Sequence, residues 1–108
     1  MEPAQYIPSD ELQQRFNASP YPSMIQEGIL RTEIVRTSHL KNPAERDEPT
    51  CTHSQFVRYS DHNGQWLVEV HRYLRPDGTL GASGMPDPKR LRIGDEIFLL
   101  DRDSPKSI

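Results

Sequence analysis

Asn63 and Gly64 lie between two runs of strand-forming residues, and this dipeptide constrains the fold more than any other feature of the chain. Asn-Gly is strongly preferred in two-residue β-hairpin turns, because both central positions of such a turn need a positive φ. We therefore expect an antiparallel hairpin over residues 54–75. With a two-residue turn, the opposed pairs are Ser60–Leu67, Tyr59–Val68, Arg58–Glu69, Val57–Val70 and Phe56–His71.

This register assigns alternate side chains to two faces of the hairpin. Arg58 lies opposite Glu69, and this match of opposite charges favours the register independently of the turn. The apolar face is predicted to be buried, and the mixed face is predicted to be either half-covered or functional. The apolar face carries Val57, Tyr59, Trp66, Val68 and Val70. The mixed face carries Phe56, Arg58, Leu67, Glu69, His71 and Tyr73.

A short helix is predicted near the N-terminus, over Asp10–Asn17. Ser9 precedes it as a candidate N-cap, and acidic residues in the first turn favour the helix dipole. Leu12 and Phe16 are four residues apart, so they share one face of this helix. Residues 1–8 are expected to be loose.

Two further strands are predicted outside the hairpin. Frequent β-branched residues indicate a strand over Ile29–Ser38, although helical spacing within residues 24–40 leaves a helix as the alternative. Residues 20–22 read as an extended link because two of the three are prolines. A tight turn at residues 94–95 leads into a final strand over Ile97–Leu100.

The order of these elements predicts an α+β fold. A small antiparallel sheet is built round the central hairpin, with a short N-terminal helix. The length predicts a single domain over residues 1–108, with its compact part over about 9–101. The charged segment 41–52 contains two prolines and is predicted to be a loop, and both termini are expected to be loose.

The chain is weakly acidic, with a formal net charge of −3. A net-acidic chain is a poor general binder of nucleic acid, so a protein partner is favoured, although a local basic patch would keep nucleic acid open. No apolar run reaches transmembrane length and the N-terminal segment resembles no leader, so we expect a cytoplasmic protein that does not bind membranes. The single cysteine, Cys51, rules out an internal disulfide and fits a reducing compartment.

A glycine-rich loop over residues 75–90, flanked by cations, is the first candidate site. Glycines let backbone N–H groups converge on an anion, and basic side chains add positive charge. The spacing matches no P-loop, so a surface loop ordered by glycine and proline is the simpler interpretation. We expect residues 81–89 to be irregular and to pack on the sheet through Leu80 or Met85. The candidate anion-binding residues are Arg75, Gly81, Ser83, Gly84, Lys89 and Arg90.

The mixed face of the hairpin is the second candidate site. Its residues suit a metal-independent ribonuclease of the toxin type, in which histidine and glutamate transfer protons and arginine holds the phosphate. The simpler interpretation is structural, because Arg58 and Glu69 neutralise each other and His71 is half-buried beside Phe56. The candidate catalytic residues are His71, Arg58, Glu69 and Tyr73.

No metal site and no cofactor are predicted. Cys51, His53, His62 and His71 do not have the spacing of known zinc ligand sets. Cys51 lies in the charged loop without an oriented base or an oxyanion site, so it is not predicted to be a nucleophile.

Two functions from different classes fit these features. We favour a small non-enzymatic binding or assembly domain of unknown ligand over the ribonuclease, because cleaving RNA needs positive potential along the substrate path. Self-association is the first interaction to expect, since a small core is marginal alone and a sheet has two edges. The four consecutive apolar residues over 97–100 need cover on both faces of the sheet, one from a helix and one from a neighbouring subunit.

Overall fold

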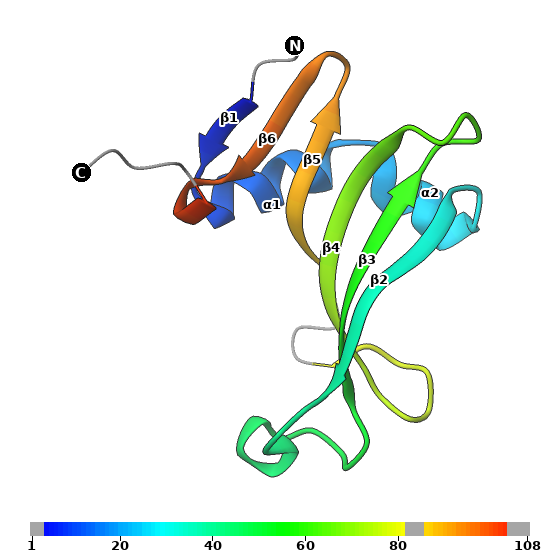
Figure 1. Ribbon diagram of the computed structural model, residues 1–108, viewed down its shortest axis with the longest axis vertical. Helices are drawn as coiled ribbons and strands as arrows, with labels where there is room; N and C mark the ends of the chain where they lie inside the picture. The colour runs from blue at the N-terminus through cyan, green and yellow to red at the C-terminus, as the bar shows by residue number, and fades with distance from the viewer. Residues whose placement is uncertain (1–3, 82–85, 104–108) are drawn as a thin grey trace.

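Residues 4–81 and 86–103 are described by the computed structural model, which folds into one sheet with two helices (Figure 1). The elements in chain order are β1 (Ala4–Ile7), α1 (Ser9–Ala18), α2 (Tyr21–Glu27), β2 (Arg31–His39), the 3-10 helix η1 (Pro43–Arg46), β3 (His53–Ser60), β4 (Trp66–Leu74), β5 (Asp87–Ile93), β6 (Glu96–Leu100) and the 3-10 helix η2 (Asp101–Asp103). The strand order is β1-β6-β5-β4-β3-β2. The predicted α+β fold is confirmed.

The sheet is mixed, which corrects the expectation of a wholly antiparallel one. Four of the five strand pairings are antiparallel, whereas β1 runs parallel to β6. Residues 1–8 were expected to be loose, yet Ala4–Ile7 pairs along Ile97–Leu100 and buries Ile7. Four residues are too few to show a strand pattern, so only the pairing with β6 reveals β1.

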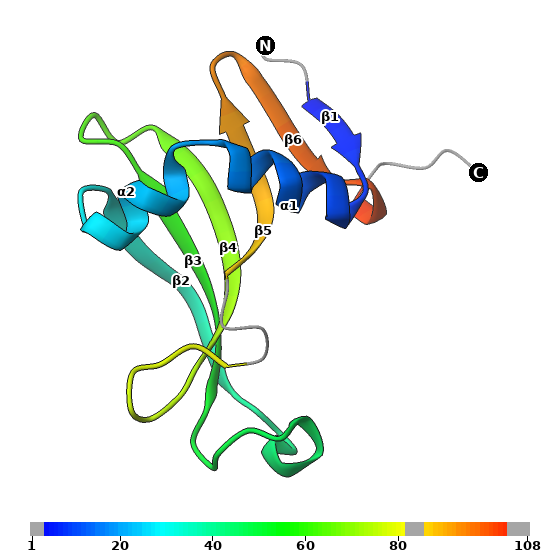
Figure 2. The ribbon, with the colours of Figure 1, turned by 180° about the vertical axis from the view of Figure 1, so that it is seen from behind.

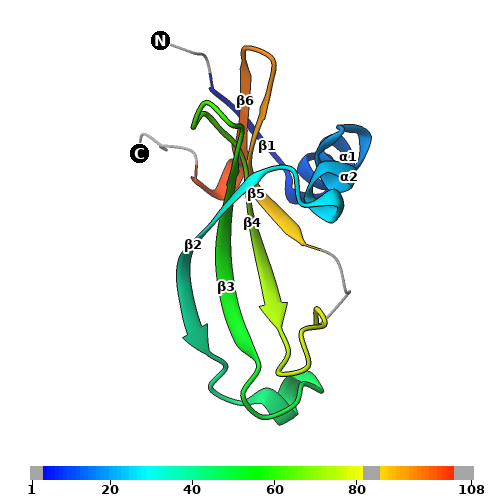
Figure 3. The same ribbon diagram turned by 90° about the vertical axis from the view of Figure 1, so that its right-hand side faces the viewer.

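Both helices lie on the same face of the sheet, as Figures 2 and 3 show. Leu12 and Phe16 are buried on α1, as their spacing predicts, and the core forms between them and the covered face of the sheet. We call this the helix face and the opposite one the open face. The buried apolar residues of the core are Ile7, Leu12, Phe16, Tyr21, Leu30, Val57, Tyr59, Val68, Val70, Leu91, Phe98 and Leu100.

The second helix replaces the extended link that was expected at residues 20–22. Pro20 has helical φ and ψ at the N-cap of α2, and Pro22 lies in its first turn, where a missing N–H leaves no helical hydrogen bond unmade. The hydroxyl of Tyr21 donates to the backbone carbonyl of Arg92, which ties α2 to β5. The segment 24–40 therefore begins as a helix and continues as the strand β2.

The β3–β4 hairpin forms, with most of the predicted register. Tyr59–Val68, Arg58–Glu69, Val57–Val70 and Phe56–His71 are opposed as expected. The connection is longer than predicted, because residues 61–65 lie between the strands and Ser60 pairs with Trp66. Within it, the Gly64 N–H donates to the Asp61 carbonyl at 3.0 Å, and Gly64 has a φ of +86°.

A bulge at Leu67 places Trp66 and Leu67 on the faces opposite to those predicted. The register shifts between Tyr59 and Ser60, which leaves Leu67 as the extra residue. Since one extra residue reverses the alternation beyond it, Leu67 packs against the core and Trp66 does not belong to the core. The Arg92 guanidinium instead lies 4.6 Å from the centroid of the Trp66 ring. The prediction that Trp66 faces the core is wrong, whereas Val57 and Val68 are buried as expected.

The predicted loop over residues 75–90 ends earlier than expected, because β5 begins at Asp87. Pro88 is buried and pairs with Val70 beside a register shift, where a strand tolerates the missing N–H. The chain then turns tightly at residues 94–95 into β6, as predicted. Leu80 forms an isolated bridge with Leu74, so the start of the loop does contact the sheet. Met85 lies outside the described residues.

Candidate functional site

The four candidate residues of the mixed face all lie on the open face of the sheet. Arg58 and Glu69 are opposed on β3 and β4, and the Arg58 Nε lies 3.4 Å from Glu69 Oε2. A second acid, Glu33 of β2, reaches Arg58 at 3.9 Å. Arg58 therefore contacts two carboxylates, and Glu69 lies within hydrogen-bonding distance of Arg58 rather than of His71.

His71 belongs to a row of three rings on the open face. Its ring centroid lies 5.0 Å from that of Phe56 and 4.8 Å from that of Tyr73. The Nε2 atom of His71 lies 2.7 Å from the hydroxyl oxygen of Ser54, across the β3–β4 pair. This hydrogen bond fixes the orientation of the imidazole, and we call Phe56, His71 and Tyr73 the aromatic row.

Two arginines flank the aromatic row. The guanidinium carbon of Arg36 lies 4.8 Å from the centroid of the Phe56 ring, and that of Arg46 lies 5.8 Å from the centroid of the Tyr73 ring. Arg46 also donates to the Tyr73 hydroxyl at 3.1 Å. These cations come from β2 and η1, so three segments distant in sequence meet at one end of the open face.

The surroundings of His71 favour the neutral imidazole. Burial is the main cause that lowers the pKa of His71 below its ordinary value of 6.5. The positive charges of Lys89, Arg46 and Arg36 lower this pKa further. Asp87 acts in the opposite direction but does not reverse the shift. His71 thus lies in a locally positive field, although the whole chain is acidic.

A polar pocket of about 360 Å³ adjoins the aromatic row. It lies where the end of β2 and η1 meet the ends of β3 and β4. Hydroxyl, amide and basic side chains dominate its lining, so it suits a polar ligand better than an apolar one. Its lining residues are Ser38, His39, Leu40, Lys41, Asn42, Glu45, Arg46, Ser54 and Tyr73.

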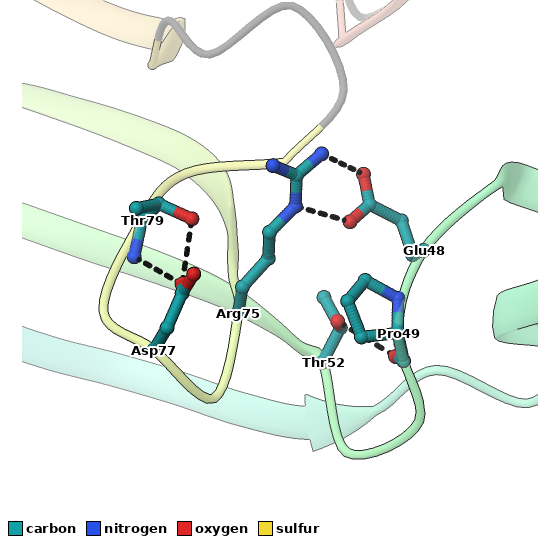
Figure 4. Close-up of polar contacts among 6 residues, drawn as sticks. All are labelled: Glu48, Pro49, Thr52, Arg75, Asp77 and Thr79. Carbon is teal, nitrogen blue, oxygen red and sulfur yellow. Dashed lines mark hydrogen bonds and ion pairs between the residues drawn. The ribbon is translucent and has the colours of Figure 1, made fainter.

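Arg75, the first cation of the glycine-rich loop, forms an ion pair with Glu48. Arg75 forms two hydrogen bonds to Glu48, from Nε at 2.8 Å and from Nη2 at 3.2 Å (Figure 4). Only 3% of the Glu48 side chain is exposed. Glu48 belongs to the charged segment 41–52, which is joined to the rest of the chain by this ion pair and by the hydrogen bond from Arg46 to Tyr73.

The remaining anion-binding candidates are dispersed. A Cβ on Gly81 would lie 2.5 Å from Glu48 Oε1, so this glycine leaves space for the carboxylate. Lys89 pairs with Asp87 at 2.8 Å, and Arg90 lies opposite Glu69 in the β4–β5 register. Ser83 and Gly84 lie outside the described residues.

The outer strand β2 is a further functional candidate, which the sequence did not single out. All nine of its residues are exposed, including Ile34 at 50% and Val35 at 44%. One side of β2 pairs with β3, and its other side has no strand partner in the described part of the chain. The run of β-branched residues was the available signal, but sequence alone does not distinguish an outer strand from an inner one.

Comparisons with known proteins found no match. The chain matches no protein-family model, and no curated protein or solved structure shows significant similarity to it. Within residues 4–81 and 86–103, neither helix has the length and apolar character needed to cross a bilayer.

Proposed function

We propose that this chain is a small non-enzymatic assembly domain that pairs with a second copy of itself through β2. The observation that carries the proposal is the exposure of the whole strand, together with the apolar side chains of Ile34 and Val35. A long outer strand offers unpaired backbone N–H and C=O groups to another strand. Natural edges are normally shortened, covered, bulged, charged or interrupted by proline. β2 is nine residues long and contains no proline, although it carries one bulge and three charged residues.

The sequence of β2 is complementary to itself when two copies run antiparallel. If Ile34 of one copy faces Val35 of the other, then each Glu33 faces an Arg36. The same register places Thr32 opposite Thr37. Opposite-charge and threonine pairs each stabilise a cross-strand contact by roughly 0.2–1 kcal/mol.

A bulge in β2 is what allows this register. In a regular strand, residues three apart point to opposite faces, so Glu33 and Arg36 would not meet across a two-fold axis. The register of β2 on β3 shifts between Ile34 and Arg36, which restores a common face. Glu33 contacts Arg58, and Arg36 covers Phe56, so both lie on the open face.

The two threonines share the other face. Thr32 lies opposite Tyr59, and Thr37 lies opposite Gln55 and accepts a hydrogen bond from it at 3.5 Å. Both partners are buried on the helix face. The self-complementary register therefore matches the faces as well as the charges.

Exchanging the charges across the two-fold axis tests the proposal. In a Glu33→Arg chain each dimer opposes two arginine pairs, and in an Arg36→Glu chain it opposes two glutamate pairs. We expect each variant alone to be a monomer in sedimentation experiments at micromolar concentration, and their equimolar mixture to form a heterodimer. Glu96→Arg, at an exposed position of β6, is the matched control and should associate as the unmodified protein does.

A wild-type chain that remains monomeric at these concentrations contradicts the proposal, and it would favour a different protein as the partner of β2. Association of Glu33→Arg and of Arg36→Glu that is as strong as that of the unmodified chain would place the interface elsewhere.

Metal-independent RNA cleavage is the alternative function, and the environment of His71 supports it. A neutral imidazole hydrogen-bonded to Ser54 and flanked by Arg36 and Arg46 suits a general base near a phosphate. Arg58 and Glu69 contribute less than expected, because they contact each other. Cleavage of RNA without added metal, lost in His71→Ala at unchanged stability, would favour the nuclease over the assembly domain.

A further inference from the structure

Arg46, which lines the polar pocket, differs from Arg58 and Arg75 in its partners. Arg75 has Glu48 and Arg58 has Glu69 within hydrogen-bonding distance. Arg46 instead contacts the hydroxyl and the ring of Tyr73, and no carboxylate within residues 4–81 and 86–103 forms an ion pair with it. Its guanidinium is thus oriented by a neutral group, and the other N–H donors have no acceptor in the described part of the chain.

The pocket brings further donors beside Arg46. Lys41 supplies a second positive charge, and Ser38 and Asn42 supply a hydroxyl and an amide. Glu45 is an acid of the same lining, so the two cations exceed it by one charge. A planar arginine, a lysine and neutral donors in one concave site form the combination that proteins use for phosphate groups.

We propose that this pocket binds the phosphate group of a small molecule. The Arg46 guanidinium donates two parallel hydrogen bonds to phosphate oxygens, and Lys41 neutralises a further part of the charge. The ring of Tyr73 forms one wall and leads to His71 and Phe56 along the open face. A nucleoside attached to the phosphate has an aromatic surface to contact there, whereas inorganic phosphate has only the donors.

Titration of the full chain, followed by its backbone amide resonances at constant ionic strength, tests this site. The probes are inorganic phosphate and adenosine monophosphate, with chloride as the anion that sets the background. We expect saturable shifts confined to residues 38–46, 54 and 73. Arg46→Gln should weaken phosphate binding about tenfold or more, since it removes a charge-assisted hydrogen-bonding pair.

Arg102→Gln is the matched control, because Arg102 is an exposed arginine of the other 3-10 helix, η2. It should bind phosphate as the unmodified chain does. Lys41→Gln is the second variant, and we expect a smaller loss because a lysine contributes a point charge without the paired geometry. Tighter binding of adenosine monophosphate than of phosphate supports the site and adds contact with the aromatic row, whereas equal affinities support recognition of phosphate alone.

Three results would overturn the proposal. The first is the absence of saturation with both probes. The second is wild-type affinity in Arg46→Gln, and the third is an equal loss in Arg102→Gln, which would reveal general attraction of anions. Arg46, Lys41 and Arg102 lie outside β2, so the three substitutions leave the proposed self-association register unchanged.

Discussion

The helix face and the open face of the β3–β4 hairpin come from the same alternating sequence, and they differ in what covers them. Val57, Val68 and Val70 are fully buried beneath the helices. On the open face, 14% of the Glu69 side chain and 36% of the Arg58 side chain remain exposed. Alternation therefore separates two sets of side chains, while the position of α1 and α2 decides which set forms the core.

The largest expected difference between the faces lies in β6. Phe98 is 1% exposed beneath Arg15 of α1, whereas its neighbour Leu99 points to the open face and is half-buried. Phe98→Ala should reduce the free energy of unfolding by about 3–5 kcal/mol, and Leu99→Ala by about 1 kcal/mol. Urea denaturation of both variants measures the difference. Equal losses would show that the open face is covered as completely as the helix face.

A smaller difference in stability is expected between two ion pairs, Glu48–Arg75 of the loops and Glu69–Arg58 of the open face. Glu48 is almost fully buried against Arg75, whereas Glu69 contacts a partly exposed Arg58. Glu69→Gln should lower the free energy of unfolding by less than about 1 kcal/mol. Glu48→Gln should lower it more, because it leaves Arg75 without its bidentate partner. Urea midpoints compare the two, and a larger loss for Glu69→Gln would contradict the contrast.

The smallest expected effect is the dependence of stability on pH that arises from His71 on the open face. Because the folded-state pKa of His71 lies below 6.5, the unfolded chain binds the proton more readily. The stability due to the neutral imidazole is fully present above about pH 6.5, and it is lost as the pH falls through the lower folded-state pKa.

His71→Gln keeps a polar partner for Ser54 and removes the titration. Between about pH 8 and about pH 5, we expect the unmodified chain to lose more stability than the variant, as measured by urea midpoints at each pH. The charged groups around His71 (Lys89, Asp87, Arg46 and Arg36) are common to both chains, so the comparison isolates the imidazole. Parallel pH profiles would show that protonating His71 is equally easy in the folded and unfolded chains.

The open face of the hairpin shows which parts of a candidate site can be predicted from the sequence. The sequence predicted that Arg58, Glu69, His71 and Tyr73 share a face, and they do, although the predicted two-residue turn does not form. The bulge at Leu67 offsets the longer connection and keeps the pairs from Tyr59–Val68 onward in the predicted register. No sequence pattern indicated Arg36 and Arg46 beside the same rings, because β2 and η1 are brought there by the β2–β3 pairing and by the folding of segment 41–52. Contacts between segments distant in sequence leave no periodic pattern.

Sequence patterns were enough to predict the α+β class, the helix bearing Leu12 and Phe16, and which residues of the central hairpin oppose one another from Tyr59 and Val68 onward. These features depend on local preferences of the backbone and on alternation, which act over a few residues. The folded arrangement was needed to reveal the parallel pairing of β1, the exchange of Trp66 and Leu67, and the position of β2 at the edge. The positions of β1 and β2 depend on which strand lies beside which. The exchange of Trp66 and Leu67 depends on a single extra residue that reverses the two faces of β4.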